Sequence, residues 1–313
     1  MDGSAPDRRT GPVVVALGGN TLLGKQGPWT VDEQTAAIER TAREISEAIE
    51  DGYEIVLTHG NGPQVGTLLL QQETAIETPQ LPLDVLVAET QAQIGYLLQQ
   101  ALDNELTDST DFITIVTQVV VDGDDPAFAD PTKPIGPFYT EEAAAEKPFE
   151  TKRVSTGDRP YRRVVPSPEP VEIVEGDEIA NLVHRGNLVI AAGGGGVPVV
   201  RDDGLSGVEA VVDKDTTTRL LASELGVGTL VLLTDVEFAY VNYDTPDQRP
   251  IREVTARALR THLEAGEFGA GSMRPKVEAC LQFVEEGGDR AVITSPDRLL
   301  DALAGETGTQ VRG

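Results

Sequence analysis

The sequence predicts an α/β fold with a mainly parallel, open central sheet. Runs of Val, Ile, Leu and Ala at residues 13–17, 54–58 and 188–192 have the length and composition of buried strands, and each ends in a glycine-rich turn. The first sixty residues also repeat the order strand, glycine turn, helix, which is typical of right-handed crossovers between parallel strands. Because open α/β sheets bind ligands at the carboxyl ends of their strands, we expect the functional site among the glycine turns.

The first helix is predicted from Thr30 to about Gly52. Thr30 and Glu33 have the spacing of a capping box, and isoleucines recur along one face until the glycine ends the helix. A second helix is expected to begin near Pro63, because proline is favoured in the first turn. A long helix follows over residues 84–105.

Residues 112–121 form a further strand-rich run, after which the character of the sequence changes. Prolines recur from residue 122 to residue 170, and this stretch shows neither helical nor strand periodicity. It is too long for an ordinary connection in a compact domain. We interpret it as an inserted, protruding lid subdomain. A disordered loop is the alternative, and the aromatic residues within the stretch favour order.

The alternation of helices and strands resumes at Asp177. The expected elements are a short helix ending at Gly186, the strand 188–192 with the glycine run 193–196, a helix ending at Gly226, a strand at 230–233, helices at 255–265 and 275–286, and a final strand at 291–294. A domain boundary near residue 215 fits this order, and the sheet can equally run across it.

The charge balance is strongly acidic. The chain has 52 Asp and Glu against 25 Lys and Arg, a formal net charge of -27 spread along the whole sequence. Salt would screen the resulting self-repulsion, so we expect a halophilic source. Nucleic acid is not expected as a partner, because duplex binding needs clustered basic residues. No apolar run is long enough for a membrane helix and the first residues contain no apolar signal core, so we expect a cytoplasmic protein without membrane contact.

Cysteine and histidine offer no metal site. Cys280, the single cysteine, lies at helical spacing among apolar residues and is expected in the core. The three histidines, His59, His184 and His262, do not stand at ligand spacing. We expect a structural or supporting role for His59 and packing or surface positions for the other two.

Lysine is scarce, which makes its positions informative. Only six of the 25 basic residues are lysine, so a lysine kept beside glycines, prolines or a helix start is a candidate for phosphate binding. Lys214 lies between Asp213 and Asp215 at a strand-to-helix transition, Lys276 follows Pro275 at a helix start, and Lys133 has prolines on both sides. A movable ammonium at such positions suits phosphate work, whereas a solvent-exposed salt bridge is the alternative for Lys214.

The glycine turns suit close approach of backbone N–H groups to a phosphate. The four turns are Gly18-Gly19-Asn20, His59-Gly60-Asn61-Gly62, Gly193 to Gly196, and Gly271-Ser272. Their spacing matches neither the P-loop pattern nor the dinucleotide-binding pattern. Each turn taken singly is equally consistent with a simple tight turn, but four such patches, three of them directly after buried strands, indicate a phosphate-binding site.

Seven strings along the chain resemble the carbamate kinases of the amino acid kinase superfamily. In order, over residues 13–276, they are VVVALGGN, LTHGNGPQVG, PTKPIGPF, RRVVPSPEP, GGGGVPVV, GVEAVVDKD and GSMRPK. The insertion that carries PTKPIGPF and VVPSP distinguishes carbamate kinases from acetylglutamate, uridylate and aspartate kinases. The resemblance implies an αβα sandwich around the parallel sheet, together with the protruding lid at 122–170.

The resemblance also implies the reaction, ATP plus carbamate giving reversibly ADP plus carbamoyl phosphate, with Mg2+ accompanying the nucleotide and ATP synthesis in arginine fermentation as the useful direction. By position in the motifs, Lys214 and Lys276 would neutralise developing charge, Asp215 would orient them, and Lys133 would reach in from the lid. The carbamoyl and transferred phosphoryl groups would be bound by Gly18, Gly19, Asn20, Gly60, Asn61 and Gly62. The nucleotide would be bound by Thr234, Asp235, Tyr243, Met273 and Lys276.

At the level of organisation, the resemblance implies a homodimer whose chains have two lobes. Residues 11–215 would form the acceptor lobe, which includes the lid, and residues 216–313 the nucleotide-binding lobe. Pro160-Tyr161 replaces a Gly-Trp pair common in the family, which bears on lid packing and not on the chemistry. Three alternatives remain: another small-acid kinase of the same family, a synthetase that makes carbamoyl phosphate physiologically, or an inactive nucleotide-binding sensor that keeps the fold.

Overall fold

The computed structural model describes residues 11–19, 21–23, 30–75, 77–106, 112–269 and 273–313. A large sheet has the strand order β15-β17-β16-β12-β1-β2-β9-β3, and every neighbouring pair in it is parallel except β16 and β17. Its strands are β1 (Val13–Leu17), β2 (Ile55–His59), β3 (Phe112–Thr114), β9 (Leu188–Ile190), β12 (Thr229–Leu233), β15 (Glu253–Thr255), β16 (Arg290–Thr294) and β17 (Thr309–Arg312). The predicted mainly parallel central sheet is confirmed.

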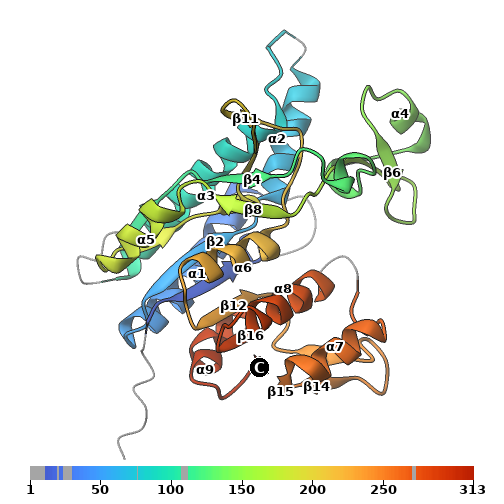
Figure 1. The fold of residues 1–313 in the computed structure, drawn as a ribbon. Coiled ribbons are helices and arrows are strands. Elements are labelled where there is room, and N and C mark those ends of the chain that lie inside the picture. The colour runs from blue at the N-terminus through green and yellow to red at the C-terminus, as the bar shows by residue number, and fades with distance from the viewer. Residues whose placement is uncertain (1–10, 20, 24–29, 76, 107–111, 270–272) are drawn as a thin grey trace, which may run out of the picture.

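Helices cover both faces of this sheet, as Figure 1 shows. Alternate side chains of β1 point to opposite faces, so Val13 and Val15 belong to one apolar cluster and Val14 and Ala16 to the other. The first cluster contains α1 (Val31–Glu50), α3 (Leu83–Glu105) and α9 (Leu299–Leu303). The second contains α5 (Gly176–His184), α6 (Lys214–Glu224), α7 (Ala256–Glu264) and α8 (Met273–Glu285). The architecture is therefore the expected αβα sandwich.

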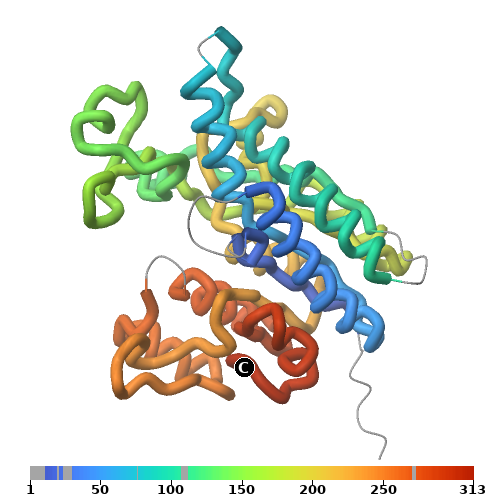
Figure 2. Tube along the Cα trace, turned by 180° about the vertical axis from the view of Figure 1, so that it is seen from behind, coloured from blue at the N-terminus to red at the C-terminus, as the bar shows by residue number. Residues whose placement is uncertain are grey.

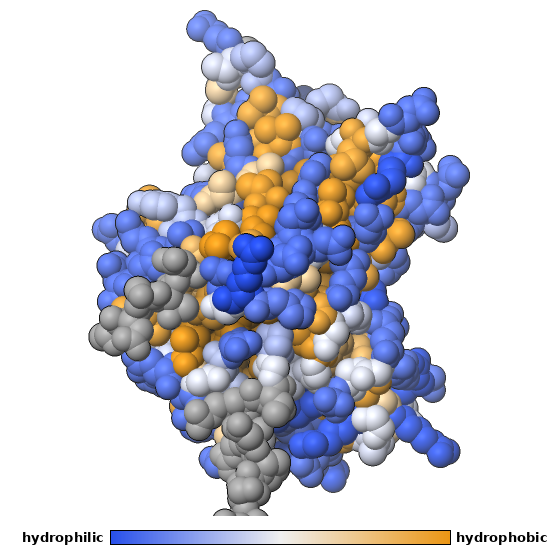
Figure 3. All heavy atoms as spheres, turned by 60° about the vertical axis from the view of Figure 1, so that its left-hand side comes forward, coloured by the Kyte–Doolittle hydropathy of each residue, from blue (hydrophilic) through white to orange (hydrophobic). Residues whose placement is uncertain are grey.

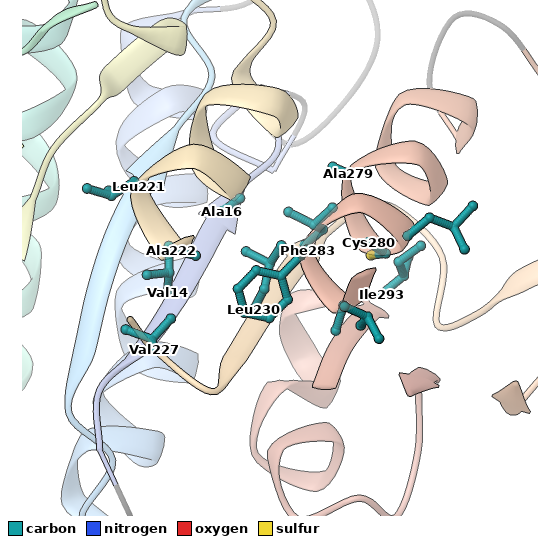
Figure 4. Packing of buried hydrophobic residues seen from close by; sticks show 14 of the residues in the cluster. Val14, Ala16, Leu221, Ala222, Val227, Leu230, Ala279, Cys280, Phe283 and Ile293 are labelled. Carbon is teal, nitrogen blue, oxygen red and sulfur yellow. The ribbon is translucent and has the colours of Figure 1, made fainter. Parts of the chain in front are cut away.

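The core includes Cys280, as its spacing predicted. Figure 4 shows Cys280 and Phe283 on α8 packed toward Leu230 and Ile293 of the sheet. Cys280 is fully buried, and burial raises the pKa of its thiol well above the usual range. The thiol is a packing group in this position.

The first helix begins as predicted. The Thr30 hydroxyl accepts a hydrogen bond from Glu33 N at 3.2 Å, and the Glu33 carboxylate accepts one from Thr30 N at 2.8 Å, which completes the capping box. The next helix, α2 (Gly62–Thr74), has proline in its first turn, also as predicted.

The strand-rich run at 112–121 is divided between two sheets. β3 stays in the central sheet, whereas β4 (Gln118–Val121) joins a second sheet with β8 (Pro170–Ile173), β10 (Val197–Arg201) and β11 (Leu205–Gly207). The turn between β3 and β4 is fixed by Gln91, whose side chain accepts from Thr117 N at 2.8 Å and donates to Thr117 O at 3.0 Å. This tertiary contact has no local signature.

Residues 122–170 fold into an ordered subdomain that projects from the body, as Figures 1 and 2 show. Its sheet consists of β5 (Lys133–Tyr139), β7 (Tyr161–Val165) and β6 (Thr151–Arg153), in that order and antiparallel. It also contains the one-turn helix η1 (Pro126–Phe128) and α4 (Glu141–Ala145). The stretch therefore consists of regular strands and short helices, in place of the disordered loop considered as an alternative.

The C-terminal part differs from the prediction at its end. The strand predicted at 291–294 is present as β16, but it is not the last strand, because η3 (Pro296–Arg298), α9 and β17 follow it. β17 lacks an alternating apolar pattern, since Gln310 occupies a buried position where its amide donates to Ala302 O and Thr307 O. A small hairpin of β13 (Ala239–Val241) and β14 (Arg249–Ile251) lies nearby.

The central sheet runs continuously across residue 215, since β12 pairs with β1. In Figure 3 hydrophilic side chains cover most of the visible face, and hydrophobic ones gather in patches near its centre. Within the described ranges, no helix has both the length and the apolar character needed to span a membrane.

Candidate functional site

The glycine turns after β1 and β2 lie against one another. Gly60 N donates a hydrogen bond to Leu17 O at 3.0 Å, and a Cβ on Gly60 would lie only 3.0 Å from Gly19 N. The two backbones therefore approach at a distance that a larger residue would prevent. Asn20, which was expected to share this role, lies outside the described residues.

The third glycine run, η2 (Gly193–Gly195) and Gly196, supports the second turn from behind. A Cβ on Gly194 would lie 2.1 Å from Asn61 Nδ2, and one on Gly193 would lie 2.4 Å from His59 Nε2. All four residues of the run are buried. Asn61 is held on its other side by a hydrogen bond from its Nδ2 to Thr90 Oγ1 at 2.9 Å. The run is thus a packing surface that fixes His59 and Asn61.

His59 is neutral in this environment. Its side chain is almost wholly buried, and burial lowers its pKa from 6.5 to about 4, an effect that nearby Lys214 adds to and a contact with Gly60 O partly opposes. A neutral, buried imidazole packed on a glycine agrees with the supporting role expected for it. His184 and His262 lie in α5 and α7, also as expected.

Two lysines meet on one buried carboxylate. Asp215 Oδ1 accepts from Lys214 Nζ at 2.5 Å, and Asp215 Oδ2 accepts from Lys276 Nζ at 2.9 Å. The side chains of Lys214, Asp215 and Lys276 are 13%, 6% and 10% exposed. α6 starts at Lys214 and α8 starts at Met273, so both ammonium groups stand at helix N-termini, where the backbone dipole favours an anion.

The charges of this cluster depend on one another. Burial alone would raise the pKa of Asp215, but Lys214 and Lys276 outweigh it and hold that pKa well below its usual range. Burial lowers the pKa of Lys214, as does Lys276, while Asp215 opposes both effects. Two ammonium groups on one carboxylate give the cluster a formal charge of +1 in a site that excludes most water. That arrangement stabilises negative charge far more strongly than exposed lysines would.

α6 is tied to the glycine turns by threonines. Thr218 Oγ1 donates to Lys214 O at 2.7 Å and lies 2.7 Å from Thr58 Oγ1 of β2, while Thr217 Oγ1 donates to Gly195 O at 3.0 Å. A Cβ on Gly60 would also lie 3.7 Å from Lys214 Cδ. The lysine is thereby placed directly beside the second glycine turn.

Lys133 reaches the same region from the lid. Its Nζ donates to Asp213 Oδ2 at 2.7 Å, and Asp213 is the N-cap residue of α6, immediately before Lys214. The structure thus gathers the three lysines singled out in the sequence around the start of one helix. Asp213 was not among the site residues expected from the sequence, although an acidic residue before a helix is a known N-cap signal.

A cavity of about 490 Å³ opens beside the first glycine turn and Lys276. All five residues expected to bind nucleotide line it, namely Thr234, Asp235, Tyr243, Met273 and Lys276. The remaining lining residues are Gly18, Gly19, Leu233, Val236, Tyr240, Glu267, Phe268 and Gly269. Tyr240 and Phe268 were missed in the sequence, because single aromatic residues outside a motif carry no signal. The fourth glycine turn, at 271–272, lies outside the described residues.

A second cavity, also of about 490 Å³, lies between the start of α2 and the lid. Asn61 and Gly62 line it from one side, and β5 residues 134–138 line it from the other. Arg162 of β7 also lines it, with its Nε and Nη2 both donating to Gly136 O. Arg162 was not expected from the sequence. The cavity is enclosed by the glycine turn and the lid together, so its shape depends on where the lid stands.

The two cavities border a single path for a transferred group. Gly18 and Gly19 line the first cavity and Asn61 and Gly62 the second, and the two turns are in contact. The buried lysine cluster stands beside both turns. The geometry can hold a polyanionic donor on one side and a small acceptor on the other, with positive charge beside the turns that join the two cavities. In-line phosphoryl transfer needs this arrangement.

Comparisons with known proteins agree with this geometry. A model of the amino acid kinase family matches residues 11–295. The carbamate kinase of Halobacterium salinarum is 54% identical over 95% of this chain and 97% of its own length, and that of Thermococcus kodakarensis is 49% identical over 96% and 98%. The solved structure of a carbamate kinase from Giardia lamblia bound to AMP-PNP has a TM-score of 0.90 at 42% identity, covering 97% of this chain and 99% of that one.

Proposed function

Since this chain belongs to the amino acid kinase family and, within it, to the carbamate kinases, we propose that its site transfers a phosphoryl group reversibly between ATP and carbamate. The products are ADP and carbamoyl phosphate. The observation that carries the proposal is the pair of buried ammonium groups on Asp215, with Lys276 at the wall of a nucleotide-sized cavity and Lys214 beside the glycine turn that precedes the second cavity.

In this proposal the nucleotide occupies the first cavity. Thr234, Asp235, Tyr243 and Met273 contact it, and Lys276 reaches its phosphates from the start of α8. The Giardia relative was solved with AMP-PNP, a nucleotide of the same class, which supports a nucleotide in the matching cavity. The aromatic side chains and Met273 supply the apolar surface that a purine ring needs.

The acceptor occupies the second cavity, against the turn after β2. A carbamate oxygen attacks the γ-phosphorus of ATP, the bond from that phosphorus to the β,γ-bridging oxygen breaks, and ADP leaves with the electron pair. Backbone N–H groups of Gly18, Gly19, Asn61 and Gly62, together with Asn20, bind the transferred group. Gly60, whose own N–H is bonded to Leu17 O, contributes by letting the two turns approach each other. Lys214 and Lys276 neutralise charge on the oxygens in line, and Asp215 fixes both lysines.

Lys133 completes the acceptor side from the lid. Its ammonium has three donors, and within the described residues one of them bonds to Asp213, so the others can bind an acceptor anion. Closure of the lid over the cavity would exclude water and bring this charge to the acceptor.

Mg2+ enters the proposal with the nucleotide. When bound, the ion would neutralise charge on the phosphates, and magnesium in kinases is held largely by phosphate oxygens and water. Within the described part of the chain no group of three or more His, Cys, Asp or Glu side chains could hold a metal ion. The phosphates would therefore provide most of its ligands, which agrees with the small number of carboxylates at the first cavity.

We further propose a cytoplasmic homodimer that works toward ATP synthesis in arginine fermentation. One surface suited to a second copy is the sheet edge at β3, where Tyr96 and Val116 are exposed beside a hollow of about 550 Å³. Light scattering should give about twice the chain mass of 33.4 kDa. A Tyr96→Glu variant should give a smaller mass in the same measurement if this edge is the interface.

We also propose that the chain has two lobes. Residues 11–215, which include the lid at 122–170, bind the acceptor, and residues 216–313 bind the nucleotide.

A halophilic origin is part of the proposal, supported by the net charge of -27. Screening by salt should relieve the repulsion among carboxylates, so the melting temperature should rise between about 0.1 M and about 2 M KCl. Thermal unfolding followed by circular dichroism measures this. A melting temperature independent of KCl would contradict the proposal.

The activity is tested by ATP formation from ADP and carbamoyl phosphate in molar KCl, with acetyl phosphate assayed in parallel. We expect ATP from carbamoyl phosphate and little from acetyl phosphate. Equal use of both would indicate another small-acid kinase. Nucleotide binding without turnover would indicate a sensor that keeps the fold.

A further inference from the structure

Asp213 makes two contacts that belong to different parts of the molecule. One carboxylate oxygen, Oδ1, accepts from Asp215 N at 2.9 Å and from Thr216 N at 3.5 Å, which caps α6. The other, Oδ2, accepts from Lys133 Nζ at 2.7 Å. A single side chain thus holds both the start of the helix that carries Lys214 and the first residue of the lid strand β5.

The second contact goes beyond what a helix cap requires. Asp and Asn cap helices about equally well through one side-chain oxygen, so the capping function alone does not explain a charged residue here. The bond to Lys133 is charge-assisted, which makes it shorter and stronger than a neutral hydrogen bond. It also spans 80 positions in sequence, from the lid to the catalytic helix.

This ion pair is one of two charged links between the lid and the segment that leads into α6, among the described residues; the other joins Arg163 Nη2 of β7 to Glu209 Oε2 at 2.6 Å. Between these two links, Val211 N donates to Pro166 O at 3.0 Å, which joins the segment before α6 to the end of β7. The lid therefore meets the segment leading into the catalytic helix through a backbone hydrogen bond as well as the ion pairs. The Lys133 and Asp213 side chains are 35% and 24% exposed, which leaves the pair free to adjust when the lid moves.

We propose that Asp213 is a positioning residue that couples the lid to the catalytic helix. It holds the Lys133 ammonium at the N-terminus of α6. The position of the lid and the position of Lys214 therefore depend on the same carboxylate. The proposal rests on the proposed function, because there Lys133 contacts the acceptor. Asp213 itself touches no reacting atom; it acts through Lys133.

The test compares Asp213→Asn with Lys133→Ala. In Asp213→Asn the side-chain oxygen of the new amide can still cap α6, whereas a neutral amide cannot attract the ammonium. We expect a KM for carbamoyl phosphate raised about tenfold, the loss typical of one charge-assisted hydrogen bond. The KM for ADP should stay the same, because the first cavity is not lined by Asp213. Because both changes break one interaction, the double variant should behave like Lys133→Ala alone.

A second readout does not depend on activity. Hydrogen exchange should accelerate in β5 of Asp213→Asn while the first turn of α6 stays protected. Asp130→Asn is the matched control, because it removes a lid carboxylate paired to Lys152 at 2.5 Å on the exposed surface. That control should leave both the KM and the exchange of β5 unchanged, since exposed pairs contribute little.

Two results would overturn the coupling. If Asp213→Asn matches the wild type in both KM and β5 exchange, Asp213 is only a cap. If the effects of Asp213→Asn and Lys133→Ala on KM multiply in the double variant, the two residues act independently. A protein without turnover whose β5 exchange still responds to Asp213→Asn would reject the proposed function and support the coupling.

Discussion

The lysines of the buried cluster and the lysines of the lid all form ion pairs with carboxylates, but the pairs of the lid are more exposed to solvent. Lys214 and Lys276 share Asp215 in a setting that is at most 13% exposed, and backbone, threonines and glycines surround the start of the helix that carries Lys214. In the lid, Lys133 pairs with Asp213 and Lys147 with Glu73, in settings between 23% and 35% exposed. Because solvent screens the outer pairs, charge at the centre is fixed while charge at the lid can be rearranged.

The difference suggests a division of labour in the proposed reaction. Transition-state charge must be met by groups that do not reorganise, and the buried cluster has that property. Admission of the acceptor must involve motion, and a lid held by part-exposed ion pairs can move. The experiments below test whether the two regions differ as much as their burial indicates.

The largest effect is expected for Asp215→Asn. Without the carboxylate charge two buried ammonium groups face each other, so unfolding free energy should fall by about 3–5 kcal/mol, the usual loss when one partner of a buried ion pair is removed. Urea unfolding in molar KCl measures it, and Asp130→Asn serves as the control. A loss below about 1 kcal/mol, the range of exposed pairs, would mean that water reaches the cluster and that the contrast with the lid is false.

Acid should destabilise the centre through His59. Its pKa is lowered from 6.5 to about 4 in the folded protein, so the unfolded chain binds the proton more readily between these values. Stability is therefore complete above pH 6.5 and falls by roughly 3 kcal/mol as the pH drops through about 4. Urea midpoints near neutral pH and near the lowered pKa give the difference. It should shrink in His59→Asn and persist in His184→Asn, whose imidazole is exposed. Equal pH dependence in all three proteins would refute this assignment.

Lys214→Ala and Lys276→Ala should each lower kcat on the order of 100-fold or more, or about 2.7 kcal/mol of transition-state stabilisation. The fold should survive, because Asp215 keeps one ammonium partner in each variant. Steady-state kinetics of ATP formation measure the effect, with Lys152→Ala as a surface control. Turnover near that of the wild type in both variants would remove the proposed role of the cluster.

The smallest effect is expected at the outer lid contact. The Glu73 carboxylate accepts from Tyr139 Oη and, at 2.6 Å, from Lys147 Nζ, whose ammonium lies 4.4 Å from the centre of the Tyr139 ring. Glu73→Gln should raise the KM for carbamoyl phosphate only severalfold and leave kcat nearly unchanged, since the contact is partly solvated. An effect as large as that of Lys214→Ala would show that the lid is as rigidly required as the centre.

Much of the fold could be predicted because its signals are local. Buried apolar strands, the Thr30 capping box and the glycines after each strand are all readable within a few residues. Gln91, which bends the chain between β3 and β4, acts across 26 positions, and its effect could not be read from either segment. β17 was missed for a similar reason, because its buried Gln310 is satisfied only by the chain that surrounds it.

The site residues, too, were predicted where their signal is local and missed where it depends on the fold. Three lysines were conspicuous because the chain has only six, and the structure gathers those three around one helix start. Asp213 and Arg162 were not conspicuous in a sequence rich in Asp, Glu and Arg. Their importance comes from positions that only the folded chain defines, at the base of the lid and in the wall of the second cavity.

The glycine run behind the second turn limits how this site could be altered. A side chain at Gly194 would collide with Asn61 and one at Gly193 with His59, so that wall admits no substitution that would reshape it. The opposite wall, β5 residues 134–138, belongs to the lid and includes residues with ordinary side chains. A bulkier acceptor would therefore have to be accommodated by the side chains that line the second cavity from α2, such as Val65 and Leu70, and from the lid, because the glycine run leaves no space behind the second turn.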